Sequence, residues 1–183
     1  MDKFVSRGGV KLQAAVENWQ LKIGNLTCLD VGSSTGGFVD CLLQNGAAKI
    51  YALDTAYGEL AWKLRNDPRV VVMERTNILY LQSLPEQVDL ITIDAGWTKL
   101  ELVLPVVKRF LKKDGLIIAL LKPHYEGSQK HLVKGVVPEN LIEKIKERTI
   151  KNIENLGFKV QNVIDSPILG GGGNKEYLLR IIV

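Results

Sequence analysis

Short apolar runs and segments with helical spacing alternate along most of the chain. Apolar runs rich in β-branched residues predict strands at 27–32, 49–54, 70–74, 88–94 and 116–122. Helical spacing predicts helices at 37–44, 60–66, 100–112 and 138–156, preceded by a short helix within about residues 1–20, near 11–19. Strands that alternate with helices are typical of a mostly parallel sheet covered on both faces, so the pattern indicates an α/β fold.

The end of the chain departs from this alternation. Two further strands are predicted at 160–165 and 177–183, and only a glycine-rich link separates them. Strands that are joined without a crossover helix pair antiparallel. We therefore expect a seven-stranded, mostly parallel sheet with an antiparallel last strand, in a single domain that spans residues 1–183.

The composition agrees with this fold and argues against a secreted or membrane-spanning protein. The chain has 183 residues, of which 46% are hydrophobic and 24% are charged, and its net charge of +4 permits a nucleic-acid partner without requiring one. No apolar run approaches the roughly 18 residues that a membrane span needs, and the N-terminus lacks a signal-peptide core. We expect a cytoplasmic protein with no membrane partner, and nothing in the sequence specifies its oligomeric state.

A glycine-rich turn follows the first predicted strand and leads into a helix. A phosphate-binding P-loop would need a lysine after Gly37, where Phe38 stands, and a dinucleotide fingerprint would need glycine in place of Ser34. Both phosphate ligands are therefore disfavoured, and S-adenosylmethionine is the remaining common ligand of such a turn, with its carboxylate against the helix N-terminus. The expected cofactor contacts are Asp30, Gly32, Ser33, Ser34, Thr35, Gly36, Gly37, Phe38, Asp54, Asn77 and Asp94.

Two of these residues lie at the ends of other predicted strands. Asp54 follows the turn by about 20 residues, which is the place for a carboxylate that binds the two ribose hydroxyls. Asn77, after the third strand, is expected to bind the adenine edge. The alternative is that Asp54 only caps a helix and that Gly36 and Gly37 only permit close packing.

Three ionisable residues from distant parts of the chain are expected at the same edge of the sheet. Asp94 and Lys122 end their strands, and Glu176 begins the antiparallel last strand at that edge. Lys11 can join them from the N-terminal helix. Together they suit the deprotonation of a ribose hydroxyl, with Lys122 as general base if burial and Lys11 lower its pKa, and the two carboxylates orienting the lysines. No metal ion is required for this reaction. The alternative is that these four residues only form two ion pairs on the protein surface.

At these residues the sequence resembles a known family over nearly its whole length. The segments "SRGGVKL", "CLDVGSSTGGF", "AYGELAWKLRNDPRVVVMERTN", "KP" with "YEG", and "GNKEYLL" resemble the TlyA-type, hemolysin-like branch of the FtsJ-related RNA 2'-O-methyltransferases. The resemblance implies a Rossmann-like class I methyltransferase fold, S-adenosylmethionine as methyl donor and ribosomal RNA, free or in a ribosomal subunit, as substrate. It also implies a catalytic tetrad of Lys11, Asp94, Lys122 and Glu176.

Three features depart from the family pattern. The family usually carries an S4-type RNA-binding domain before "SRGG", and this chain has no room for one. Gly96-Trp97-Thr98-Lys99 stands where the family has Ser-Phe-Ile-Ser, although Trp97 keeps an aromatic ring that can stack on a base. The segment "KGVV" at 134–137 lacks one glycine of the usual "GGVV". The residues expected to contact RNA are Arg7, Trp97, Lys130 and Lys134.

Other functions remain as alternatives. The segment Asp94-Ala95-Gly96-Trp97 lacks both prolines of the base amino-methyltransferases, and neither Cys28 nor Cys41 is placed as the nucleophile of a cytosine C5 enzyme or as half of a disulfide. An NAD-dependent oxidoreductase would need the missing fingerprint, and a membrane-active hemolysin would need an amphipathic or spanning segment. An inert RNA-binding module is the main rival. His124 and His131 are not expected to be catalytic.

Overall fold

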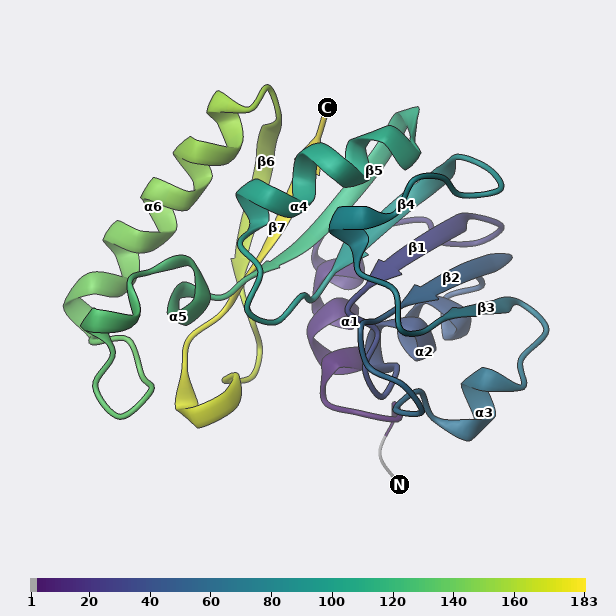
Figure 1. The fold of residues 1–183 in the computed structure, drawn as a ribbon, viewed down its shortest axis with the longest axis horizontal. Coiled ribbons are helices and arrows are strands. Elements are labelled where there is room, and N and C mark those ends of the chain that lie inside the picture. The colour runs from purple at the N-terminus through teal and green to yellow at the C-terminus, as the bar shows by residue number, and fades with distance from the viewer. Residues whose placement is uncertain (1–2) are drawn as a thin grey trace.

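The computed structural model describes residues 3–183, apart from the side chain of His131, and contains one seven-stranded sheet (Figure 1). The order of the strands across the sheet is β3-β2-β1-β4-β5-β7-β6. Their bounds are β1 Thr27–Val31, β2 Lys49–Leu53, β3 Val70–Met73, β4 Val88–Ile93, β5 Leu111–Leu121, β6 Lys159–Asp165 and β7 Tyr177–Ile182. The seven strands predicted from the apolar runs are therefore confirmed.

The directions of the strands bring distant parts of the chain to one edge. Strands β1 to β5 pair in parallel, whereas β7 is antiparallel to both β5 and β6. In this register Leu121, at the end of β5, pairs with Tyr177, at the start of β7. The carboxyl ends of the parallel strands and the beginning of β7 thus share an edge, and this confirms the predicted mostly parallel sheet.

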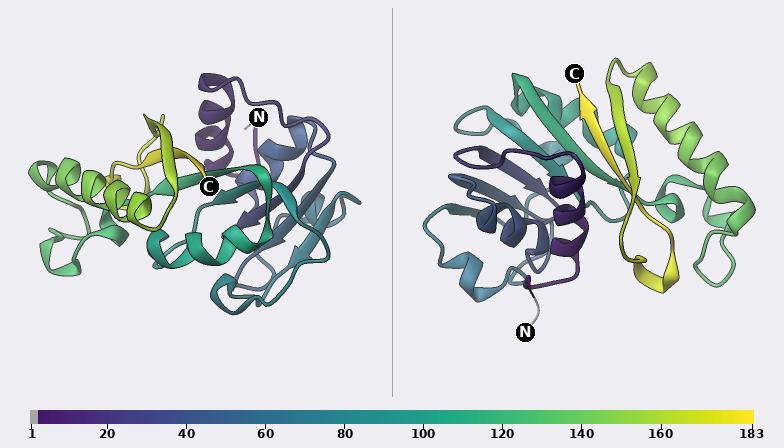
Figure 2. Two further views of the ribbon diagram at one scale, coloured as in Figure 1. Left: turned by 90° about the horizontal axis from the view of Figure 1, so that it is seen from above. Right: turned by 180° about the vertical axis from the view of Figure 1, so that it is seen from behind.

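Helices cover both faces of the sheet, as the views from above and behind show (Figure 2). Helices α1, Gly8–Asn18, and α2, Gly37–Gln44, pack on one face, and α4, Leu100–Val107, and α6, Glu139–Asn155, pack on the other. The short helices are α3, Trp62–Arg65, and α5, Pro123–Glu126. The 3-10 turns are η1 Ile78–Tyr80, η2 Lys108–Phe110, η3 Gln129–His131 and η4 Gly171–Gly173.

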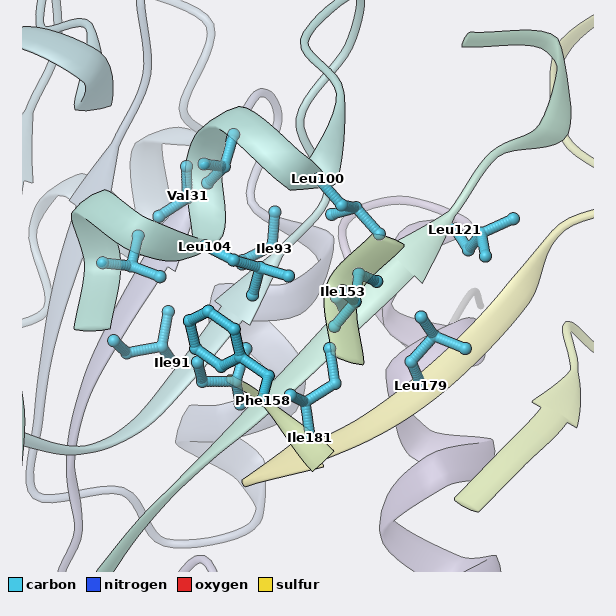
Figure 3. Close-up of a cluster of buried hydrophobic side chains, with 14 of the residues drawn as sticks. Val31, Ile91, Ile93, Leu100, Leu104, Leu121, Ile153, Phe158, Leu179 and Ile181 are labelled. Carbon is cyan, nitrogen blue, oxygen red and sulfur yellow. The ribbon is translucent and has the colours of Figure 1, made fainter. Parts of the chain in front are cut away.

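Alternate residues of the strands build a separate apolar core on each face. Figure 3 shows the core beneath α4 and α6, where Ile91 and Ile93 of β4 meet Leu104 of α4 and Phe158. These four side chains are almost completely buried. Since successive strand residues point to opposite faces, the intervening residues such as Leu90 join the second core under α1 and α2. A double-sided core explains why the central strands read as continuous apolar runs.

The helix predicted at 100–112 is wrong at its C-terminal end. Helix α4 stops at Val107, a 3-10 turn follows, and β5 already begins at Leu111, five residues before the predicted strand. Leu111 is buried and pairs with Val88 of β4, and the pairing resumes at Leu116 after a register shift. The exposed residues 112–114 lie within this shift. Pairing with β4 has therefore outweighed the helical spacing of the apolar residues in this segment.

Two findings bear on protein class. No helix among residues 3–183 is both long and apolar enough to cross a membrane.

Cys28 and Cys41 are buried free thiols, and burial raises the pKa of each to about 12. Both thiols are therefore protonated at neutral pH and lie inside the core, which agrees with the expectation that neither acts as a nucleophile.

Candidate active site

The glycine-rich turn brings the end of β1 very close to the end of β4. Gly32 has a φ of +86°, and a Cβ atom there would lie 2.7 Å from the backbone oxygen of Asp94. A side chain at this position would therefore need both an unfavourable backbone conformation and a displaced neighbour. Gly36, with a φ of +100°, then turns the chain into α2. The absence of a side chain at Gly32 lets the start of the turn lie directly beside Asp94.

The carboxylate of Asp54 fixes the position of this turn. Its Oδ2 accepts a hydrogen bond from the backbone N–H of Ser34 at 2.7 Å, and its Oδ1 accepts one from Ala56 at 2.8 Å. Asn77 plays a local role as well, because its Oδ1 accepts from the Leu79 N–H at 2.9 Å and caps η1. Both side chains still line a cavity at the edge of the sheet.

Three cavities adjoin at this edge, and all of them are lined by Asp94. The turn pocket, of about 240 Å³, lies over the glycine-rich turn and the start of α1. The Asp54 pocket, of about 540 Å³, extends from Asp94 past Asp54 to Asn77. The aromatic pocket, of about 410 Å³, is lined by Trp97 and Tyr125 and shares Asp94, Trp97 and Lys122 with the Asp54 pocket. Asp94 thus lies where three recesses meet.

Two lysine–carboxylate pairs lie at this junction. Lys122 Nζ is 2.5 Å from Asp94 Oδ1, although this contact lacks the alignment of a hydrogen bond, and Nζ also lies 3.5 Å from the Asp94 backbone oxygen. Lys11 Nζ donates a hydrogen bond to Glu176 Oε2. Only 3% of the Glu176 side chain and 11% of the Lys11 side chain are exposed, so this second pair is buried. All four side chains line the aromatic pocket.

An aromatic wall lies beside the lysines, and only part of it was expected from the sequence. The rings of Trp97 and Tyr125 have centroids 5.0 Å apart, and Lys122 Nζ lies 5.5 Å from the Tyr125 centroid. Trp97 is 80% exposed and has a positive φ of 62°. Tyr125 was not predicted, because it lies in the unpredicted helix α5. An aromatic residue three positions after a strand-ending lysine was the available signal.

The predicted site residues do not all reach these cavities. Those that line the turn pocket are Arg7, Lys11, Gly32, Ser33, Ser34, Thr35, Gly37, Phe38 and Asp94. Trp97 and Lys134 line the aromatic pocket, whereas Lys130 is exposed and lines none of the three. Gly36 and Asp30 are buried and also line none of them.

Burial sets the protonation of two residues near the site. It raises the pKa of Asp30 to about 7, and the charges of Asp94 and Asp54 add to the effect while a hydrogen bond from Thr92 opposes it. Burial also lowers the pKa of His124, with the nearby lysines Lys122 and Lys11 contributing, so its imidazole is neutral at pH 7. His124 lines the aromatic pocket as an uncharged ring.

Comparison with known proteins identifies the family. A model of the FtsJ-like methyltransferases matches residues 4–181. YqxC of Bacillus subtilis is 41% identical over 187 residues, which cover 98% of this chain and 66% of its own length. The 16S/23S rRNA (cytidine-2'-O)-methyltransferase TlyA of Mycobacterium tuberculosis is 39% identical over 182 residues, which cover 96% of this chain and 67% of its own. The chain thus spans about two thirds of the length of these curated relatives.

Solved structures agree with this assignment. The crystal structure of a hemolysin-named protein from Lactococcus lactis superposes with a TM-score of 0.94 at 40% identity, covering 99% of this chain and 89% of that one. An S-adenosylmethionine-dependent methyltransferase from Mesorhizobium loti shares the fold, with a TM-score of 0.66 at 14% identity, covering 92% of this chain and 95% of that one. The Rossmann-like fold and the resemblance seen in the sequence are both confirmed, and the chain belongs to the FtsJ-like methyltransferase family, in its TlyA and hemolysin branch.

Proposed function

We propose that the chain is an S-adenosylmethionine-dependent RNA ribose 2'-O-methyltransferase that acts on ribosomal RNA in the cytoplasm. The observation that carries the proposal is the position of two lysine–carboxylate pairs where the three pockets adjoin. The names of relatives such as TlyA of Mycobacterium tuberculosis support the same reaction and substrate class.

The residues around the turn and Asp54 pockets fit the chemistry of S-adenosylmethionine. The first backbone N–H groups of α2 have no partners within the helix and suit the carboxylate of the cofactor. Asp54, at the end of β2, suits the ribose hydroxyls, and Asn77 suits the adenine edge. Asp94 borders both pockets and lies on the path between them. When bound, the cofactor supplies an electrophilic methyl group on a positively charged sulfur.

Lys122 is the proposed general base. A ribose hydroxyl becomes a competent nucleophile when its proton is removed during attack, and Lys122 Nζ, in its neutral form, accepts that proton. The ribose oxygen gains the methyl group as it loses the proton, so charge does not accumulate on the substrate. Asp94 holds Nζ at the junction of the pockets, where the hydroxyl and the methyl group must meet. This route needs no metal ion.

The second pair has a different proposed role. Lys11 and Glu176 form a buried, hydrogen-bonded ion pair that places a positive charge in the same pocket as Lys122. Glu176 holds the Lys11 ammonium group in place in this pocket. The pair therefore shapes the pocket beside Lys122 while leaving no unpaired buried charge.

The aromatic pocket is the proposed site of the target nucleotide. Trp97 and Tyr125 offer ring faces on which an unpaired base can stack, and this mode of recognition is typical of single-stranded RNA. Lys134 at the rim of this pocket, Lys130 on the neighbouring turn and Arg7 at the turn pocket are the proposed phosphate contacts.

Lys122→Ala tests the proposal. We expect the variant still to bind S-adenosylmethionine by calorimetry but to lose about 10²- to 10⁴-fold in turnover. Turnover is measured as methyl transfer to unmodified ribosomal RNA, followed by nuclease digestion to identify 2'-O-methylated nucleosides. Lys113→Ala, an exposed lysine at the other edge of the sheet, is the matched control. Cofactor and RNA binding without any methyl transfer by the native chain would instead indicate an inert RNA-binding module.

A further inference from the structure

The aromatic pocket is walled by two loops that a single buried side chain joins. One loop is the turn at residues 133–136, and the other is the glycine-rich connection between β6 and β7, which contains η4. Both contribute to the lining of the pocket, through Lys134 and Gly135 on one side and Gly171 and Gly172 on the other. The side chain between them is that of Asn174.

Asn174 uses both ends of its amide to hold the two loops together. Its Nδ2 donates hydrogen bonds to the backbone oxygens of Gly135 and Gly171, each at 3.0 Å. Its Oδ1 accepts from the backbone N–H of Val137 at 3.1 Å. Asn174 is only 4% exposed, so these contacts are shielded from competition with water. One residue thus crosslinks segments that lie 37 to 39 positions apart in the sequence.

The turn that Asn174 holds is one that the sequence disfavours. Val133 and Val136 exchange two backbone hydrogen bonds, and Lys134 and Gly135 between them have φ values of +51° and +81°. Positive φ at both central positions is easy for glycine but costs free energy for lysine, which carries a Cβ atom. Contacts from outside the turn must therefore stabilise this conformation of Lys134. The hydrogen bond from Asn174 Nδ2 to the backbone oxygen of the next residue, Gly135, is such a contact.

We propose that Asn174 is a positioning residue that sets Lys134 in its RNA-binding conformation and so shapes the substrate side of the active site. The inference rests on the proposed RNA substrate. Lys134 is exposed at the rim of the aromatic pocket, where its ammonium group can reach a phosphate of the strand that carries the target nucleotide. Fixing the turn before RNA binds lowers the conformational entropy lost on binding, and this raises affinity without any contact between Asn174 and RNA.

Asn174→Asp tests this inference, because the aspartate keeps the oxygen that accepts from Val137 but loses both Nδ2 donors. We expect its dissociation constant for a fluorescently labelled, unmodified ribosomal RNA transcript to rise about tenfold relative to the native chain. Its affinity for S-adenosylmethionine should remain within about twofold, since Asn174 lines neither cofactor pocket. Asn162→Asp, on an exposed position of β6, introduces the same charge as a matched control.

A double-mutant cycle separates positioning from a general structural role. Lys134→Gly removes the ammonium group and also the strain at φ +51°, so Asn174 has little left to act on in that background. We expect Asn174→Asp to raise the RNA dissociation constant much less in Lys134→Gly than in the native chain. Equal effects in the two backgrounds, or equal RNA affinity of Asn174→Asp and Asn162→Asp, would overturn the inference.

Hydrogen exchange gives a readout that does not depend on RNA. Amides at 133–137 and 170–174 should exchange faster in Asn174→Asp, while those of β1 and β4 stay protected. Unchanged exchange in both loops would contradict the crosslink itself. Failure of the native chain to methylate RNA that it binds would overturn the proposed function and leave this inference standing, whereas failure to bind RNA at all would overturn both.

Discussion

Asp30 illustrates how the direction of one side chain decides its chemistry. It lies two residues before the glycine turn, a place from which a cofactor contact was expected, but it is fully buried and lines none of the three pockets. Its Oδ1 accepts a 2.5 Å hydrogen bond from Thr92 Oγ1, while Oδ2 has no hydrogen-bond partner among residues 3–183. A carboxylate with half of its acceptors unsatisfied in the core is costly to ionise.

The raised pKa of Asp30 predicts a pH-dependent stability. Since its pKa of about 7 in the folded chain exceeds the ordinary value of 3.8, the folded state holds an extra proton between these values. Stability therefore falls as pH rises through this window. A side-chain amide cannot ionise, so Asp30→Asn should gain stability relative to the native chain by roughly 2 kcal/mol between about pH 5 and about pH 8. Urea unfolding at both pH values measures this difference, and parallel changes in the two proteins would contradict it.

The connection between β6 and β7 is the element that places Glu176. The backbone of Gly170 packs so closely against this carboxylate that a Cβ atom at position 170 would lie 1.9 Å from Glu176 Oε1. The φ of Gly170 is −74°, which any residue can adopt. The glycine is needed there for space and not for backbone conformation, because Glu176 fills the volume that a side chain would take.

Gly170→Ala should therefore displace the Glu176 carboxylate and weaken its pair with Lys11. We expect a loss of about 1 to 3 kcal/mol in the free energy of unfolding, typical of overpacking, together with reduced methyl transfer. Gly24→Ala is the matched control, since its φ is not positive, no atom of the described residues lies within 4 Å of the added Cβ, and Gly24 lines none of the three pockets. Thermal unfolding and activity of both variants, compared at one temperature, check this expectation. Equal behaviour of the two alanine variants would show that Glu176 can move without consequence.

At the scale of elements, strand ends were predictable and irregular segments were not. Asp94, Lys122 and Glu176 were placed together correctly because a parallel sheet gathers its strand ends at one edge, whatever the sequence between them. Tyr125 and Asn174 were missed because they lie in α5 and after η4, whose short sequences carry no periodicity. Their positions depend on tertiary contacts such as the bond from Asn174 to Gly135.

At the scale of the whole molecule, the basic residues are divided between the amino ends of the strands and the opposite edge, which carries the proposed site. The net charge is only +4, and some basic residues, such as Lys112 in its ion pair with Asp89, lie at the amino ends of the strands, away from the proposed site. Lys11 and Lys122 are also paired with carboxylates, so the positive charge at the proposed site comes from the exposed residues Arg7, Lys130 and Lys134. Local clustering, more than net charge, is what should attract an RNA strand to this edge.

The salt dependence of RNA binding tests this distribution. Each phosphate contact releases bound counterions, so the slope of log affinity against log salt should become shallower by about 0.7 to 0.9 when one such lysine is removed. We expect this change for Lys134→Ala and for Lys130→Ala, with S-adenosylmethionine affinity unaltered in both. Lys113→Ala changes the net charge equally but at the opposite edge, so its slope should match that of the native chain. If all three variants shift the slope alike, RNA responds to the overall charge of the molecule, and the phosphate contacts assigned to the aromatic pocket and its neighbouring turn are wrong.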